Sequence, residues 1–247
     1  MTRWTVIGAA LAAAGGTEGI PLPYSPRTDD VVALALFGCF FLSAYVLSRS
    51  RKFLFQLVKD FLLHRQRTSI FATSTASDMR YLLLLILQTC VLAGIFLFNY
   101  FVHVSPGLVQ HVPPGQLLGI YIGVCLCYLF LKWVVYSLLG WIFFDGGTVS
   151  LWMESYSTLL YYLGFALFPF VLLSVYFGLG VQAMVIIGLI LAVFAKILIS
   201  YKWIKLFCNN LYGSLLLILY FCALEVIPCF MLFRGMMQLN DFLITKF

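Results

Sequence analysis

The sequence has too few charged residues to cover a protein dissolved in water. Asp, Glu, Lys and Arg make up 10% of its 247 residues, whereas soluble domains carry about 25%. Apolar residues account for 63% of the chain, against about 45–50% in soluble domains. This composition excludes an ordinary soluble fold, and lipid is the solvent that fits it.

The sequence also lacks the motifs of familiar enzyme and cofactor sites. It contains no Walker-type glycine loop, no His-Glu-x-x-His motif and no Ser-His-Asp ordering. His103 and His111 have no carboxylate or cysteine nearby, so they give weak support for a metal site. The seven cysteines lie in or beside apolar runs, without the spacing of a disulfide framework or a zinc site. We expect no metal and no cofactor, and a non-enzymatic role is favoured over an enzyme.

Long apolar runs dominate what is present. A helix needs about 20 apolar residues to cross the hydrocarbon of a bilayer. Six segments qualify, at residues 31–48, 79–101, 116–136, 156–177, 181–200 and 211–232. The sequence therefore predicts an all-α polytopic membrane bundle of about six transmembrane helices. We expect one transmembrane domain over residues 31–234, an exterior segment over 1–30 and a short exterior tail over 235–247.

The links between these segments indicate how the helices follow one another. Three prolines in residues 103–115 end the helix between the second and third spans. The link at 178–180 is so short that the fourth and fifth spans must form an antiparallel hairpin. Residues 1–20 are compatible with a signal peptide, a weak seventh span or an exterior segment, and we favour the exterior segment.

The basic residues predict the orientation. Placing the N-terminus outside puts eleven Lys and Arg residues on the cytoplasmic side and four outside, as the positive-inside rule requires. The net charge of +6 is then a topology signal rather than a nucleic-acid footprint. We expect the inner (cytoplasmic) membrane, with both termini outside, and no nucleic-acid partner.

Two further segments are predicted to lie at the cytoplasmic surface. Residues 51–67 place Leu and Phe on one helical face and Lys, Gln and Asp on the other, which is typical of an interfacial amphipathic helix. Docking of a partner is the alternative. Residues 138–154 are apolar but broken by glycines, so we expect an interfacial or re-entrant piece there. In it, Trp141 and Trp152 would lie at headgroup level. Asp145 and Glu154 could form a carboxylate pair, but helix capping is favoured, with Glu154 capping the start of the fourth span.

Glu225 is the candidate for an intramembrane polar site. It lies in the last apolar segment, about 22 Å from residue 210 at 1.5 Å per residue. An ionisable residue at that depth is a functional candidate by default. Pro228 removes the hydrogen bond to the Leu224 carbonyl, and Ser214 and Cys222 share the helical face of Glu225. The site could bind a proton or cation, or Glu225 could be a structural carboxyl at a kink.

Lys132 and Lys196 are predicted to be interface anchors rather than partners of Glu225. Each falls about 15 residues into a span that starts outside, which at 1.5 Å per residue places it near the cytoplasmic boundary. From there a lysine can extend to lipid phosphates. We therefore expect Glu225 to be protonated, or paired through water, and not bonded directly to a lysine.

A stripe of small residues marks the third span. Gly115, Gly119 and Gly123 recur at every fourth position. This spacing clears a groove in which a second helix can pack closely. The stripe predicts a helix-packing contact, either within the bundle or in an oligomer.

Short motifs in the second half of the chain carry a family resemblance. The most specific is Tyr220-x-Cys222-x-Leu224-Glu225-x-x-Pro228, and the weaker ones are Lys132 followed by Leu139-Gly140-Trp141, then Leu167-Phe168-Pro169, and Lys196. With these motifs the chain resembles an uncharacterised family of polytopic membrane proteins from Bacteroidota, a domain of unknown function. The resemblance covers residues 30–234. It implies a Gram-negative inner membrane and supplies no activity.

Two functions remain open. The first is a non-enzymatic accessory or scaffold subunit of an envelope complex for secretion or motility, partnered by lipids and other membrane proteins. Its support is the scarcity of loops and of internal polarity. The second is a small transporter or lipid flippase that uses Glu225. Transporters often contain related halves with matched broken helices, and no counterpart of Glu225 and Pro228 stands in the third span.

Overall fold

The computed structural model describes residues 24–143, 146–207 and 211–246, apart from 64–75. Every regular element in this part of the chain is helical. The elements are η1 (Pro26–Thr28), α2 (Asp30–Leu63), α3 (Ala76–Val104), α4 (Leu108–His111), α5 (Pro114–Phe143), α6 (Gly146–Tyr176), α7 (Val181–Phe207) and α8 (Leu211–Lys246). The predicted all-α helix bundle is confirmed.

Five of the described helices are long and apolar enough to cross a membrane. The crossing segments are Asp30–Arg49, Arg80–Val104, Pro114–Ile142, Trp152–Tyr176 and Val181–Lys202. The sixth predicted span lies in α8, which has 36 residues and so extends about 54 Å at 1.5 Å per residue. The chain is thus a multi-pass membrane protein.

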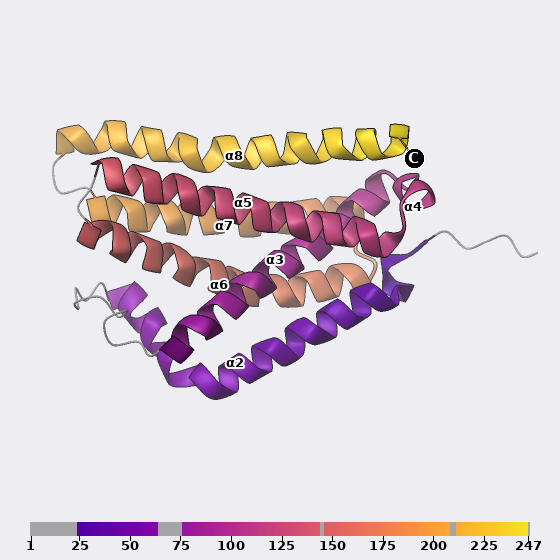
Figure 1. Cartoon of the computed structure of the whole chain (residues 1–247), viewed down its shortest axis with the longest axis horizontal. Coiled ribbons are helices and arrows are strands. Elements are labelled where there is room, and N and C mark those ends of the chain that lie inside the picture. Colours follow the sequence, from indigo (N-terminus) through magenta and orange to yellow (C-terminus); the bar gives the residue numbers. More distant parts are fainter. Residues whose placement is uncertain (1–23, 64–75, 144–145, 208–210, 247) are drawn as a thin grey trace, which may run out of the picture.

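The long helices run alternately up and down the bundle (Figure 1). The α5–α6 and α7–α8 junctions lie at one end. The start of α2, the α6–α7 link and the C-terminus lie at the other. The predicted hairpin of α6 and α7 is present, and its sharp link uses Gly178 at φ 60°, a conformation that glycine adopts without strain.

Helix α3 is the centre of the bundle and packs against α2, α5, α6 and α7. Leu92, Ile95 and Phe98 of α3 are fully buried. Two glycines mark close helix approaches to its neighbours. A Cβ on Gly94 would lie 3.0 Å from the Ile122 backbone of α5, and one on Gly164 of α6 would lie 2.3 Å from the Thr89 hydroxyl of α3. Glycine is therefore needed at both contacts.

The segment before α2 is tied to the bundle by a tyrosine and an aspartate. The Asp29 carboxylate accepts a hydrogen bond from the Val31 N–H at 2.8 Å and caps the start of α2. The Tyr24 hydroxyl donates to the same carboxylate, and its ring meets Phe98 edge-on. Partial burial, and then the negative charge of Asp29, raise the pKa of Tyr24 well above its usual value, so the phenol remains a donor.

Two predictions about helix boundaries are wrong. The first span and residues 51–63 of the predicted interfacial helix form the single helix α2; residues 64–67 lie outside the described residues, and the interfacial placement stays a prediction. The polar residues 48–50 change the composition without breaking the helix. The predicted re-entrant piece is two helix ends, since α5 runs to Phe143 and α6 begins at Gly146. Gly140 does not break α5. It is buried, and a Cβ there would lie 2.6 Å from the Val149 side chain of α6.

The new start of α6 also corrects the roles expected of two side chains. Trp152 was expected at headgroup level, but it is 3% exposed and packs against Tyr136 and Tyr156. Glu154 was expected to cap the fourth span, but it lies eight residues inside α6. Asp145 falls outside the described residues. Trp141 is 85% exposed, and its interfacial role stays a prediction.

Candidate functional site

Three charged side chains meet inside the bundle at Glu225. The Glu225 side chain is 6% exposed, and its Oε2 atom forms ion pairs with the ammonium groups of Lys132 and Lys196. The Tyr136 hydroxyl donates to Oε1. Lys196 also donates to the Glu225 main-chain carbonyl at 3.3 Å. Three donors converging on two carboxylate oxygens suit an ionised carboxylate. We call Lys132, Glu225 and Lys196 the charged triad.

The triad joins three helices. Lys132 and Tyr136 are four residues apart on α5 and so lie on one face. Lys196 comes from α7 and Glu225 from α8. An ion pair in a membrane interior satisfies groups that lipid leaves unsolvated, so the triad fixes α8 against α5 and α7.

The prediction that Glu225 has no direct basic partner is wrong, and the cause is the length of the helices. Helices α5 and α7 both run seven residues beyond the predicted span ends. Lys132 and Lys196 each lie 11 residues before the last residue of their helix, and Glu225 lies 14 residues after the first residue of α8. At 1.5 Å per residue these positions are about 17, 17 and 21 Å from the same end of the bundle. The three groups therefore share one level.

The predicted extension of Lys132 to lipid phosphates is likewise wrong. Its side chain is 4% exposed and points into the bundle. The ammonium lies 5.7 Å from the ring centre of Tyr128, 5.5 Å from that of Tyr136 and 5.8 Å from that of Tyr156. Aromatic faces within about 6 Å of a cation stabilise it. Lys132 is thus held by a carboxylate and three aromatic rings, while Lys196 is 31% exposed.

The triad carries one more positive charge than negative charge when all three groups are ionised. Two ammonium groups face one carboxylate. On insertion scales a charged side chain at the centre of a membrane helix costs about 2.5–3.5 kcal/mol. Mutual attraction offsets part of this cost, and the excess positive charge favours a further anion nearby.

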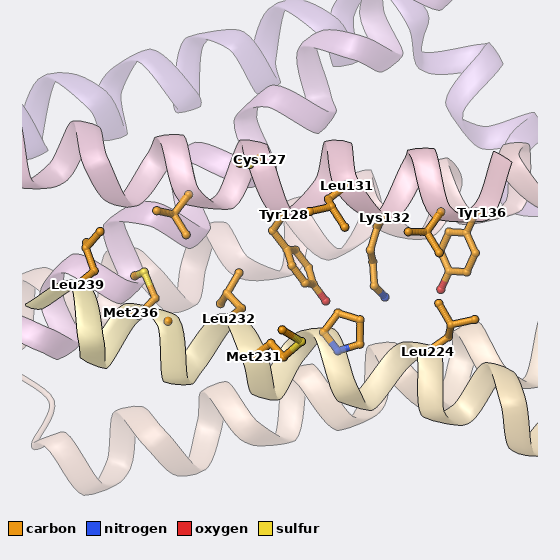
Figure 2. A pocket seen from close by; sticks show the side chains of 14 residues that line it. Cys127, Tyr128, Leu131, Lys132, Tyr136, Leu224, Met231, Leu232, Met236 and Leu239 are labelled. Atoms are coloured by element: carbon orange, nitrogen blue, oxygen red, sulfur yellow. The ribbon is translucent and has the colours of Figure 1, made fainter. Parts of the chain in front are cut away.

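A cavity of about 390 Å³ opens between α5 and α8 beside the triad. Figure 2 shows Tyr128, Lys132 and Tyr136 reaching from α5 toward α8 at one part of it. The remainder is apolar, with Met231, Leu232, Met236 and Leu239 along α8. Its size falls in the range of about 300–1,000 Å³ that is usual for ligand pockets.

The structure brings some of the predicted site residues together and separates others. Pro228 lines the cavity within one turn of Glu225. The side chains of Ser214 and Cys222 fall outside the described residues. A Cβ on Gly115 would lie 3.8 Å from the Val31 side chain of α2, whereas one on Gly119 or Gly123 would meet no described atom within 4 Å. Gly119 and Gly123 therefore face outward, and no described neighbour fills their part of the stripe.

Sequence reasoning missed the tyrosines of the site. Tyr128, Lys132 and Tyr136 recur at intervals of four on α5, which places them on one helical face. This pattern could have indicated an aromatic surround for Lys132. Tyr156 and Lys196 reach the site only through the packing of α6 and α7, and no local pattern reveals that.

The comparisons with known proteins identify a family and no activity. No curated protein and no solved structure matches the chain. One family, described as a domain of unknown function (DUF4271), matches residues 32–236. The match includes the first described span from residue 32, the other four described spans in full and the three residues of the charged triad. The chain belongs to this family.

Proposed function

We propose that the protein is a small transporter or lipid flippase of the inner membrane, with the charged triad as its intramembrane site. The observation that carries this proposal is the pairing of Glu225 with Lys132 and Lys196 about 20 Å from the end of the bundle, counted at 1.5 Å per helical residue. The proposal extends to an origin in Bacteroidota, where related chains would share the Glu225 and Pro228 motif.

The energetics of the triad favour a transport role over a purely structural one. Replacing a buried ion pair by apolar residues of similar volume is often neutral, or stabilising by about 1–4 kcal/mol. Leucines at these positions would therefore hold α5, α7 and α8 together equally well. Charged groups inside a membrane line the pathways of ions and substrates, and the adjacent cavity supplies a space next to them.

The helix that carries Glu225 is built to change shape at the site. Pro228 lies inside α8 and leaves the Leu224 carbonyl without its helical hydrogen bond. Lys196 donates to the next carbonyl, that of Glu225. A transition that moves Lys196 would release the Glu225 carbonyl and remove one of the three donors to the Glu225 carboxylate. The interruption of helical hydrogen bonding at Pro228 supports α8 as the moving element.

The orientation of the site follows from the basic residues. We place the α5–α6 end of the bundle in the cytoplasm and both termini outside, because nine of the 15 Lys and Arg residues then lie on the cytoplasmic side, four lie outside, and Lys132 and Lys196 lie in the triad. The triad then lies between the two surfaces, and a substrate from either side would have to enter the bundle to reach it.

A second candidate function has one observation in its favour. Gly119 and Gly123, the outward-facing part of the glycine stripe, leave room for a helix of another chain. An accessory or scaffold subunit of an envelope complex would use such a surface. In that case the triad would serve only to hold α8 in place.

Gentle purification from native membranes, followed by mass spectrometry of everything that co-elutes, separates the two functions. A transporter should run alone or with a bound lipid or small molecule. A stoichiometric protein partner, retained by the wild type and lost by a Gly119→Leu variant, would instead support the subunit. Leu138→Ala, at an exposed position near the end of α5, is the matched control.

A further inference from the structure

From the cavity between α5 and α8 we infer a substrate class: a single-chain amphiphile with a monoanionic headgroup. Its headgroup would lie at Lys132, and its alkyl chain would lie along α8. This inference rests on the proposed function, since it names what the charged triad handles.

The charges at the site favour an anion. When all three groups of the triad are ionised, two ammonium groups share one carboxylate, and a monoanion would bring the local charge to zero. Lys132 lines the cavity and is nine-tenths buried or more, at 4% exposed. Tyr128 lines the same part of the cavity, where its hydroxyl can donate to a carboxylate or a phosphate, whereas the Tyr136 hydroxyl already donates to Glu225. A cationic or neutral headgroup would leave the excess positive charge uncompensated.

The shape of the cavity favours one alkyl chain. Beyond Lys132 its lining is almost wholly apolar, including Val124, Leu131, Leu232 and Leu239. From Leu224 to Leu239 the lining follows about 22 Å of α8 at 1.5 Å per residue. Gly235 contributes no side chain, and a Cβ there would meet no described atom within 4 Å. The two chains of a phospholipid need much more than about 390 Å³.

The polarity of the cavity separates its ligand from bulk lipid. A bilayer lipid places its headgroup at the surface and its chain toward the centre. Here the polar part of the cavity is deep in the bundle, and the apolar part extends toward the C-terminal end of α8. A bilayer lipid that merely covered α5 and α8 would gain nothing from Lys132. Selection by headgroup charge is therefore the property that distinguishes a ligand site from a surface that bilayer lipid merely covers.

The test is equilibrium binding of radiolabelled palmitate to the purified full-length protein in a mild detergent. We expect saturable binding that unlabelled palmitate displaces, and that hexadecanol and hexadecyltrimethylammonium displace at least tenfold less well. Competition by palmitoyl-lysophosphatidylglycerol then separates two sources of the anion. If this lipid displaces palmitate, the headgroup is assigned as a phosphodiester. If it does not displace palmitate, the headgroup is assigned as a carboxylate.

Two variants locate the site. Gly235→Phe should fill the cavity and reduce palmitate binding at least tenfold, with the triad left intact. Gly119→Phe adds the same side chain on the outward face of α5, where a Cβ also meets no described atom within 4 Å, and should bind as the wild type does. Lys132→Gln should abolish the preference for palmitate over hexadecanol, and its folding is checked by monodisperse elution.

Equal competition by hexadecanol and palmitate, or wild-type binding by Gly235→Phe, would overturn the inference. Its failure is distinguishable from failure of the proposed function. Palmitate binding at a triad that water never reaches would refute transport and keep the ligand site. Water access without palmitate binding would refute the ligand class and keep transport.

Discussion

Replacement of Glu225 by glutamine should destabilise the protein strongly, because it leaves two lysines beside a neutral amide. Gln keeps the length of the side chain and an oxygen that can still accept from Tyr136 or a lysine. What is lost is the single negative charge that both ammonium groups share. The effect therefore reports on charge rather than on shape.

The magnitude follows from the burial of each lysine. Removing one partner of a buried ion pair costs about 3–5 kcal/mol, since the remaining charge has no compensation. Lys132 is 4% exposed and bears this cost in full, whereas Lys196 is 31% exposed and can turn toward the surface. The expected loss for Glu225→Gln is therefore at the lower end of that range, about 3 kcal/mol.

The assay is the free energy of unfolding in mixed micelles, titrated with SDS and followed by far-UV circular dichroism. Adding Lys132→Met to Glu225→Gln removes the uncompensated Lys132 charge and should recover most of the lost stability. The coupling energy between the two substitutions should then lie well above the deviation of about 0.5 kcal/mol expected for independent sites. Arg234→Gln is the control, because it removes an exposed basic side chain from the same helix. The Arg234 guanidinium lies 5.6 Å from the centre of the Phe230 ring, and its loss should cost less than about 1 kcal/mol.

A loss below about 1 kcal/mol for Glu225→Gln, of the size seen for exposed ion pairs, would refute this reasoning. So would additive effects of the Lys132 and Glu225 substitutions. Either result would mean that the two side chains are separately solvated and do not form the charged triad.

Three further predictions use the same unfolding measurement. Lys132→Gln should cost more stability than Lys196→Gln, because Lys132 is the more buried partner, and the reverse order would contradict the assigned burial. Gly164→Val should cost about 1–3 kcal/mol by overpacking against Thr89. The control Gly119→Val has no described atom in reach and should be nearly neutral. Equal losses of stability in the two variants would argue against the close approach of α3 and α6. The Tyr121 hydroxyl donates to the side-chain amide oxygen of buried Asn240 at 2.8 Å. Tyr121→Phe leaves this oxygen without its donor and should cost about 1–3 kcal/mol. Adding Asn240→Leu to Tyr121→Phe should recover part of this loss.

The helices were predictable because apolar length is a local property of the chain. Each of the six predicted spans corresponds to one helix, the fourth passing the end of α6 by one residue, and the tight link at Gly178 forms the predicted hairpin. Helix ends were less predictable. The polar residues 48–50 and Gly140 looked like boundaries, yet the helices continue through both, since backbone hydrogen bonds in lipid favour an unbroken helix.

The site was only half predictable, because it depends on contacts between helices distant in sequence. Glu225 was identified from its charge in an apolar segment and Pro228 from its ring. The pairing with Lys132 and Lys196 was missed, since a depth estimate needs the helix ends that the sequence left uncertain. Gly119 and Gly123 of the regular glycine stripe face outward, whereas the isolated Gly94 and Gly164 make the close contacts. Periodicity alone does not tell which glycine face is buried.

Water access to the charged triad is the most direct test of a transport site. In a chain whose seven cysteines have been replaced by alanine, Leu224→Cys places a thiol in the lining of the cavity beside Glu225, and Val226→Cys places one on an exposed outer position. The reactive thiolate forms in water and not in hydrocarbon, so a membrane-impermeant methanethiosulfonate reports water at each position. The account predicts modification at position 224 from at least one side of oriented vesicles, while position 226 stays unmodified. Protection of both positions from both sides would contradict it.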